Sequence, residues 1–320
     1  MPKYSLHPQK ISLLIDDEPV GYTPPVGPGI SFRLSYDHRE GRHPQTIDYG
    51  HVGPLWSHNW LSYVTEPGQV MLRGRGWESH VNMPAQLLTR GVLVQVTNDP
   101  PRYERTVPDG TVEVFELGDR PASQPGRRIF LTEVIDPQGH SVALTYDSSF
   151  RLVSLTDAIG QVTTFEYLDS GHPLAITKVT DPFGRYATLT YDALGRLATV
   201  TDVVGMTSSF AYGAADFIQA MTTPYGTTTF RHQEPFSPAR RIEATDPVGG
   251  TERIEYHLTH SGLSGTVSSS EVPTGFSSYN ANMNKYVVTY WDRLAMAAGP
   301  TLSNATITHL LVAPTTYGDH

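Results

Sequence analysis

The sequence predicts an all-β protein: a repetitive array of antiparallel β-hairpins, preceded by a β-rich N-terminal region. A turn-and-strand cassette recurs between residues 126 and 260. The segments between the turns alternate apolar residues with Thr or small residues, which is the period of a strand with one buried face. No stretch has the apolar spacing of a helix. The 320 residues are enough for one large β domain or two ordinary ones.

Each cassette opens with an Asp-x-x-Gly turn and reaches a Tyr seven residues after the Gly. One copy is degenerate, because Thr223 replaces the Asp and His232 stands where the Tyr is expected. The array thus has about six units. The candidate turn residues are Asp136, Gly139, Asp157, Gly160, Asp181, Gly184, Asp202, Gly205, Gly226, Asp246 and Gly249. The candidate ladder residues are Tyr146, Tyr167, Tyr191, Tyr212 and Tyr256.

The residue types in the cassette explain the hairpin. Asp, Pro and Gly at the first, second and fourth positions are the preferences of a type I turn, in which the carboxylate accepts a hydrogen bond from the N–H two residues on. A second corner over residues 191–197 returns the chain to a partner strand at 197–201. Since a single hairpin is marginal in water, the units must stack into a continuous sheet. We therefore expect Gly184→Val to destabilise the array by roughly 1–3 kcal/mol if this Gly has a positive φ.

The chain divides into three predicted regions. Residues 1–125 form the β-rich N-terminal region, with strand-like segments at 11–15, 29–36 and 92–96. Residues 126–260 are the repeat array, and a Gln-Pro-Gly sequence marks its start. Residues 261–320 contain a Ser-, Gly- and Asn-rich irregular loop at 261–285 and then a diverged repeat with a corner at 290–294.

Composition excludes several classes of protein. With 0 Cys there is no disulfide framework, thiolate metal site or Cys nucleophile. The polar N-terminus and the lack of a long apolar run argue against a signal peptide and a membrane-spanning helix. A net charge of −9, with 23 scattered Lys and Arg, disfavours nucleic acid as a partner.

Two clusters invite a chemical interpretation, but neither matches a motif. Three His and one Asp within one loop-like stretch supply Zn²⁺-type donors at spacings that match no ligand motif, so we prefer a solvated loop. They are His38, His43, Asp48 and His51. Ser57 and His58 are adjacent, and adjacent side chains on a strand point apart, which argues against a catalytic pair. We expect no enzyme activity, metal or cofactor, and almost no effect of His51→Ala.

The repeated side chains have two interpretations. The turn carboxylates could line a sugar or Ca²⁺ site, but recurrence at the hairpin period favours capping of the turns. The tyrosines could stack on sugar rings, although stacking on the next repeat is the simpler role. The aromatic candidates for ligand binding are Trp56, Trp60 and Trp77. We expect them in the core, and joint exposure of two of them would favour binding instead.

The motifs resemble those of the Rhs (YD-repeat) family, which includes bacterial polymorphic toxins, shell subunits of insecticidal toxin complexes, and teneurins. The resemblance rests on Asp-Pro-x-Gly, on Tyr191-Asp192-x-x-Gly195-Arg196-Leu197 and on the variant Phe150-Arg151-Leu152. The sequence Gly53-Pro-Leu-Trp-Ser57 is similar to a Gly-x-Gly-Trp-Ser stretch that tends to precede such repeats, with Pro54 in place of a small residue.

The resemblance implies a β-ribbon that spirals into a hollow shell around a toxin, or an adhesion body at a cell surface. The first expectation is therefore a structural scaffold involved in encapsulating and delivering a toxin, and the alternative is a glycan- or protein-binding β module. The implied partners are an enclosed toxin domain, further repeats of the same polypeptide, or a cell-surface glycan. The implied location is outside the bacterial cell, reached from the cytoplasm without a visible signal peptide. Since residues 301–313 are uncharged and strand-like, like an unfinished sheet edge, we expect a segment of a longer shell more than a complete small array.

Overall fold

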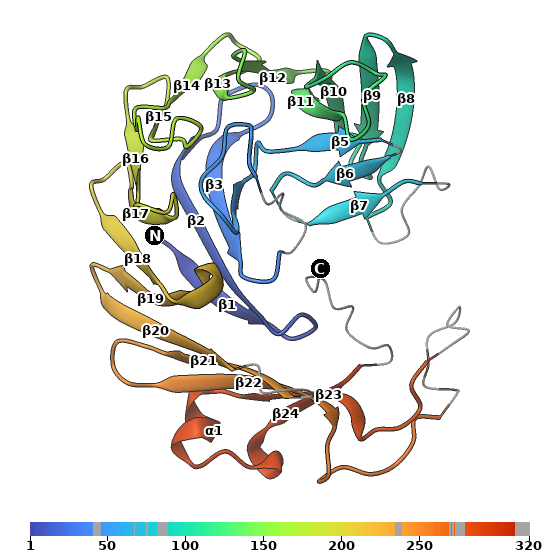
Figure 1. The fold of residues 1–320 in the computed structure, drawn as a ribbon, viewed down its shortest axis with the longest axis vertical. Coiled ribbons are helices and arrows are strands. Elements are labelled where there is room, and N and C mark those ends of the chain that lie inside the picture. Colours follow the sequence, from blue (N-terminus) through green and yellow to red (C-terminus); the bar gives the residue numbers. More distant parts are fainter. Residues whose placement is uncertain are drawn as a thin grey trace. The chain divides into compact units, whose positions relative to one another are not determined.

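The computed structural model describes residues 1–40, 46–66, 68–74, 76–81, 89–233, 239–268, 270, 272 and 279–310, and this part of the chain is nearly all β (Figure 1). The chain forms two compact units. Unit 1 consists of residues 1–2, 16–36 and 44–207, and unit 2 of residues 3–15, 37–43 and 208–320. Each unit contains hairpins from the repeat array, as well as segments from the N-terminal region.

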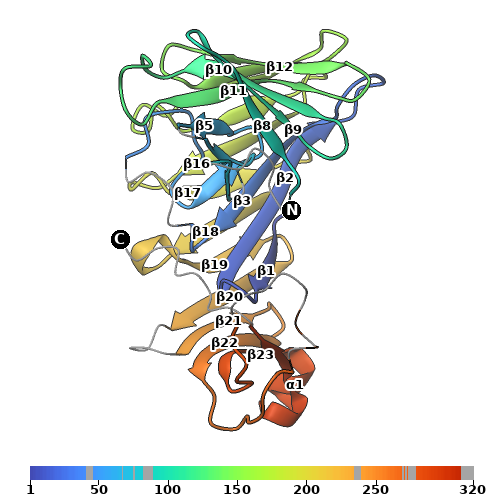
Figure 2. The same ribbon diagram turned by 90° about the vertical axis from the view of Figure 1, so that its right-hand side faces the viewer.

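The largest part of unit 1 is an antiparallel meander in which each strand pairs with the next one along the chain. Figure 2 shows its first strands side by side. The strands are β8 (Val92–Asn98), β9 (Pro101–Thr106), β10 (Val112–Gly118), β11 (Arg128–Ile135), β12 (Ser141–Tyr146), β13 (Leu152–Thr156), β14 (Val162–Glu166), β15 (Lys178–Thr180), β16 (Tyr186–Tyr191) and β17 (Leu197–Thr201). The expected hairpin array is thus present.

The meander branches at β11, whose edge is shared by two partners. Its C-terminal half pairs with β12, and its N-terminal residues pair with β5 (Tyr63–Thr65). From β5 the sheet continues through β6 (Gln69–Met71) to β7 (Trp77–Ser79). In a second sheet, β3 (Ile30–Asp37) pairs antiparallel with β4 (Trp56–His58).

The repeat strands in unit 1 have one apolar face, which packs against β2 (Ser12–Tyr22) and β3. Phe32 of β3 meets Phe165 of β14 edge to face, with 5.7 Å between ring centroids. Residues on the other face, such as Thr164 and Thr190, are exposed. Sequence alternation therefore places the core between the repeats and the N-terminal strands.

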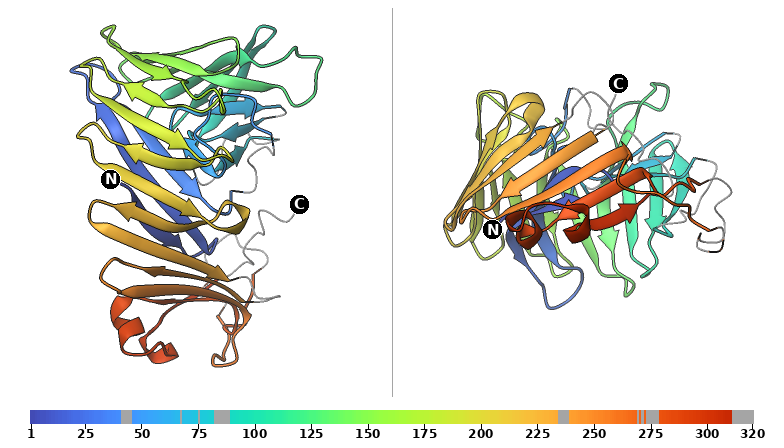
Figure 3. Two further views of the ribbon diagram at one scale, coloured as in Figure 1. Left: turned by 60° about the vertical axis from the view of Figure 1, so that its left-hand side comes forward. Right: turned by 90° about the horizontal axis from the view of Figure 1, so that it is seen from below.

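Unit 2 contains a second antiparallel meander, whose orange strands are seen in Figure 3. Its strands are β18 (Thr207–Tyr212), β19 (Ile218–Thr223), β20 (Gly226–Gln233), β21 (Ala239–Thr245), β22 (Thr251–Thr259), β23 (Lys285–Trp291) and β24 (Thr306–His309), paired in that order. The unit also contains β1 (Lys3–His7), the helix α1 (Arg293–Ala297) and 3₁₀ turns at Ala214–Asp216 and Leu302–Asn304.

The corner expected at residues 290–294 is not a hairpin turn. Strand β23 ends at Trp291, and Asp292 then caps α1 by accepting a hydrogen bond from the Ala295 N–H at 2.8 Å. Asp is a strong N-cap residue, so the Asp that opens a turn elsewhere in the array opens a helix here. With only five residues, α1 is too short to show helical periodicity in the sequence. In the described residues, no helix is long and apolar enough to cross a membrane.

The loop expected at residues 261–285 is described only in part. Within that part the chain makes an isolated antiparallel bridge between Thr266 and Asn282. The remaining residues of this predicted loop, and residues 311–313 of the predicted edge segment, lie outside the described part of the chain.

Candidate functional site

The five Asp-x-x-Gly turns share one hydrogen-bond pattern. In each turn one carboxylate oxygen accepts hydrogen bonds from the backbone N–H groups two and four residues on. For Asp181 the donors are Phe183 at 2.9 Å and Arg185 at 2.9 Å. The same pattern is found at Asp136, Asp157, Asp202 and Asp246. The carboxylates thus bind the backbone of their own turns.

The turn glycines all have a positive φ. The values are +86° at Gly139, +84° at Gly160, +78° at Gly184, +82° at Gly205, +118° at Gly226 and +89° at Gly249. At five of these positions a Cβ atom would meet nothing within 4 Å, so their requirement for Gly is conformational. Gly226 of the degenerate copy differs, since a Cβ there would lie 2.6 Å from the Pro247 side chain.

The second corner uses the same device with an added ion pair. Asp192 accepts hydrogen bonds from the N–H groups of Leu194 and Arg196, and the Arg196 guanidinium lies 2.7 Å from its other oxygen. Partial burial opposes ionisation of this carboxyl, but these hydrogen bonds outweigh burial and lower its pKa. Asp147 and Arg151 repeat the arrangement two units earlier, where Phe150, at φ +55°, occupies the place of Gly195.

Three ladder tyrosines donate to backbone carbonyls at a constant separation of 15 residues. Tyr146 donates to Leu131 O at 2.8 Å, Tyr167 to Leu152 O at 3.0 Å and Tyr191 to Ile176 O at 2.6 Å. Burial raises the pKa of Tyr146 and Tyr167 well above the ordinary value. Of the other two, Tyr212 is half-buried and Tyr256 is 9% exposed. Each of the three hydroxyls therefore ties one hairpin to backbone 15 residues earlier.

The tryptophans that were candidates for ligand binding lie inside unit 1. Trp56 and Trp60 are each 1% exposed, and the Trp60 ring N–H donates to Ser31 O at 2.7 Å. Trp77 is half-buried and packs edge to face on Tyr63. The joint exposure that would favour a binding surface is absent at Trp56 and Trp60.

Ser57 and His58 are each 2% exposed. Neither ring nitrogen of His58 has a hydrogen-bond partner in the described part of the chain, and the two side chains make no hydrogen bond to each other. Burial lowers the pKa of His58 to about 3, so the ring is neutral in the folded protein. A buried neutral imidazole without an orienting group lacks the geometry of a catalytic pair.

The described residues of the candidate Zn²⁺ cluster, His38, Asp48 and His51, each contact a different partner. His51 accepts a hydrogen bond from the Gly53 N–H at 2.9 Å, His38 accepts one from the Leu13 N–H at 2.8 Å, and Asp48 pairs with an Arg. His43 lies outside the described residues. No group of three or more His, Asp or Glu within the described ranges could hold a metal ion.

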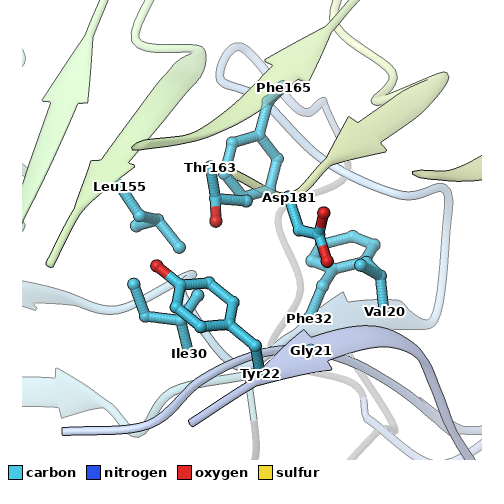
Figure 4. Close-up of a pocket in the computed structure, with 9 residues that line it drawn as sticks. All are labelled: Val20, Gly21, Tyr22, Ile30, Phe32, Leu155, Thr163, Phe165 and Asp181. Carbon is cyan, nitrogen blue, oxygen red and sulfur yellow. The ribbon is translucent and has the colours of Figure 1, made fainter. Parts of the chain in front are cut away.

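A small cavity lies between β2, β3 and the repeat strands (Figure 4). Its volume of about 10 Å³ is close to the minimum for one water molecule and too small for a sugar. Tyr22 at its wall donates to an oxygen of Asp157 at 3.0 Å. The cavity is lined by Val20, Gly21, Tyr22, Ile30, Phe32, Leu155, Thr163, Phe165 and Asp181.

A buried ionic network in unit 1 has no local signature in the sequence. Arg105 of β9 is 5% exposed and lies 2.7 Å from Glu78 of β7 and 2.9 Å from Glu113 of β10. His80 is 2.8 Å from Glu78 on the other side. Burial opposes ionisation of Glu78, but the hydrogen bonds from Arg105 and His80 outweigh it and lower the pKa. The network joins strands that are distant in sequence.

Together these features define a β-hairpin repeat protein whose repeated polar side chains are engaged with its own backbone. The RHS Repeat family model matches residues 151–186, 174–205 and 191–228. The chain therefore contains Rhs repeats in the centre of the array, as the sequence motifs predicted.

The chain is also similar to much longer solved chains of TcdB2-TccC3 and of a Tc holotoxin pore. It matches the crystal structure of TcdB2-TccC3 with 9% identity and a TM-score of 0.34, covering 91% of this chain and 19% of that one. For the Photorhabdus luminescens Tc holotoxin pore with a TccC3 mutation, identity is 12%, the TM-score is 0.26, and the match covers 95% of this chain and 20% of that one. This chain thus spans about a fifth of their length. No curated protein matches.

Proposed function

We propose that the protein is a structural scaffold: a segment of an Rhs-type β-shell that takes part in enclosing and delivering a toxin. The observation that carries this proposal is the ladder of tyrosine hydroxyls bound to carbonyls 15 residues earlier. A tyrosine hydroxyl with this spacing recurs once per hairpin and stabilises the backbone of the array itself. Five turn carboxylates that bind their own backbone support the same role.

The alternative, a glycan-binding module, receives less support from the same residues. Sugar recognition needs exposed aromatic faces and free hydrogen-bonding groups. Trp56 and Trp60 are buried, and the hydroxyls of Tyr146, Tyr167 and Tyr191 already donate to the backbone. A glycan site would have to use other residues.

The proposed partners are further repeats and a toxin domain, and the proposed destination is outside the producing cell. The test is intact mass spectrometry of the native gene product, followed by peptide mapping. We expect a polypeptide much longer than 320 residues, with hairpin repeats continuing and a non-repeat domain attached. A native product limited to these 320 residues would overturn the shell-segment proposal and favour an independent binding module.

A further inference from the structure

Two N-terminal segments contact the turns at the two edges of the repeat array in unit 1. The first, residues 19–22 at the end of β2, touches three successive Asp-x-x-Gly turns; we name it the first clamp. Figure 4 shows Gly21 and Tyr22 beside the Asp181 turn. Its hydrogen bonds are Tyr22 Oη to Asp157 Oδ2 at 3.0 Å, Arg185 Nη2 to Gly21 O at 3.1 Å and Val203 N to Pro19 O at 3.2 Å.

The second segment, residues 50–53, contacts three successive corners at the other ends of the hairpins; we name it the second clamp. His51 bridges to Ala175 in parallel, in the manner of a short strand. Its backbone hydrogen bonds are Gly50 N to Phe150 O at 3.1 Å, His51 N to Leu174 O at 2.9 Å and Ile176 N to His51 O at 2.9 Å. The third contact is steric, since Gly53 lies against the corner at 195–197.

The two glycines of the second clamp are required by close approach. A Cβ on Gly50 would lie 2.6 Å from the hydroxyl of the ladder residue Tyr167 and 3.0 Å from Arg151 Cα. A Cβ on Gly53 would lie 3.1 Å from both Gly195 O and Leu197 N, and its φ of +103° also favours Gly. Side chains at either position would push the segment away from the corners.

The clamps follow the array in opposite directions. From the Asp157 turn to the Asp202 turn, the contacting residue of the first clamp moves back along the sequence from Tyr22 to Pro19. Over the successive corners from Phe150 to Gly195, the contacting residue of the second clamp moves forward from Gly50 to Gly53.

We propose that the two clamps are an intramolecular template: the turn edges of the array are docking surfaces for N-terminal segments of the same chain, and residues 19–22 and 50–53 occupy them to hold three successive hairpins together. The template precedes the repeats in the chain, so each hairpin meets a docking segment that has already been made. This inference goes beyond the proposed scaffold function and does not depend on the toxin cargo.

Hydrogen exchange of the full chain, followed by mass spectrometry, tests the template. In Gly53→Val we expect exchange to be at least about tenfold faster in residues 174–176 and 192–197 than in the wild type, with β8–β10 unchanged. Gly139→Val is the matched control, because its φ of +86° brings comparable backbone strain at a unit 1 turn that neither clamp contacts through a hydrogen bond. Its effect should stay near residues 136–140.

A milder variant keeps the proposal testable if Gly53→Val fails to fold. Tyr22→Phe removes one hydroxyl of the first clamp, and we expect faster exchange of the Ile159 and Gln161 amides, which bind the same Asp157 carboxylate. The template would be overturned if both variants left these corners protected as in the wild type. It would equally be overturned if Gly53→Val and Gly139→Val gave the same exchange pattern.

Discussion

At the scale of single residues, the repeat turns depend on backbone conformation. Gly184 has a φ of +78° and open space around its Cα, so a side chain there strains the backbone without a clash. We expect Gly184→Val to lower the free energy of unfolding by roughly 1–3 kcal/mol, measured by urea denaturation. Gly184→Asn is the control, because Asn tolerates this region better and should cost less. Equal costs for the two variants would contradict the argument.

The tyrosine ladder makes a second residue-level prediction. Tyr191→Phe keeps the ring but leaves Ile176 O without the hydroxyl that binds it at 2.6 Å. We expect a loss of about 1 kcal/mol in the free energy of unfolding, typical of one hydrogen bond. Tyr225→Phe is the control, since Tyr225 is 77% exposed and should change stability little. If the two variants had the same free energy of unfolding, the result would argue against a structural ladder.

His58 predicts a dependence of stability on pH. Its folded pKa of about 3 lies below the unfolded value, so its contribution is full above about pH 6.5 and is lost as the pH falls towards 3. At pH 4–5.5 the unfolded chain holds this proton and the folded chain does not. In His58→Gln we expect the slope of unfolding free energy against pH in this range to be smaller by about 1.4 kcal/mol per pH unit. An unchanged slope would show that the ring titrates normally.

Sequence reasoning succeeded at residues whose role is local and failed where the role depends on distant partners. The Asp-x-x-Gly turns could be predicted because the acceptor and its donors lie within four residues of each other. His51 was expected to be dispensable, yet its ring accepts the Gly53 N–H and its backbone docks on the corner at 174–176. We therefore now expect His51→Ala to cost about 1 kcal/mol.

At the scale of elements, the buried network that joins β7, β9 and β10 is the strongest candidate for a long-range constraint. Arg105→Met removes the cation that Glu78 and Glu113 share, and we expect a loss of about 3–5 kcal/mol in the free energy of unfolding. Arg102 on the same strand is half-exposed, and Arg102→Met should cost less than about 1 kcal/mol. Chemical denaturation of both variants at neutral pH checks the difference, and similar losses would contradict the role of burial.

Several elements could not be predicted because the sequence signal was too short or too ambiguous. The strands β5, β6 and β7 have three residues each, fewer than a period-2 pattern needs. Helix α1 begins at an Asp of the kind that opens turns in the repeats. The two clamps carry no periodic pattern either, since their partners are far away in the sequence, as in the bond from Arg185 to Gly21 O, which spans 164 residues.

At the scale of the whole molecule, hairpins of the repeat array form both compact units, and the N-terminal region contributes strands to each. In unit 1 the apolar face of the repeats is covered by β2 and β3. In unit 2, Tyr4 of β1 donates to Glu252 of β22 at 2.6 Å and packs edge to face on Phe230. Residues of the N-terminal region therefore pack on repeat strands within each unit.

The central claim is that this array is a scaffold around a cargo. The most direct measurement is limited proteolysis of the native gene product from its own host, with fragments identified by mass spectrometry before and after the array is unfolded. The scaffold account predicts that a non-repeat domain resists a nonspecific protease in the native protein and is degraded once the array unfolds. A non-repeat domain cleaved equally fast in both states, or a native product without such a domain, would contradict it.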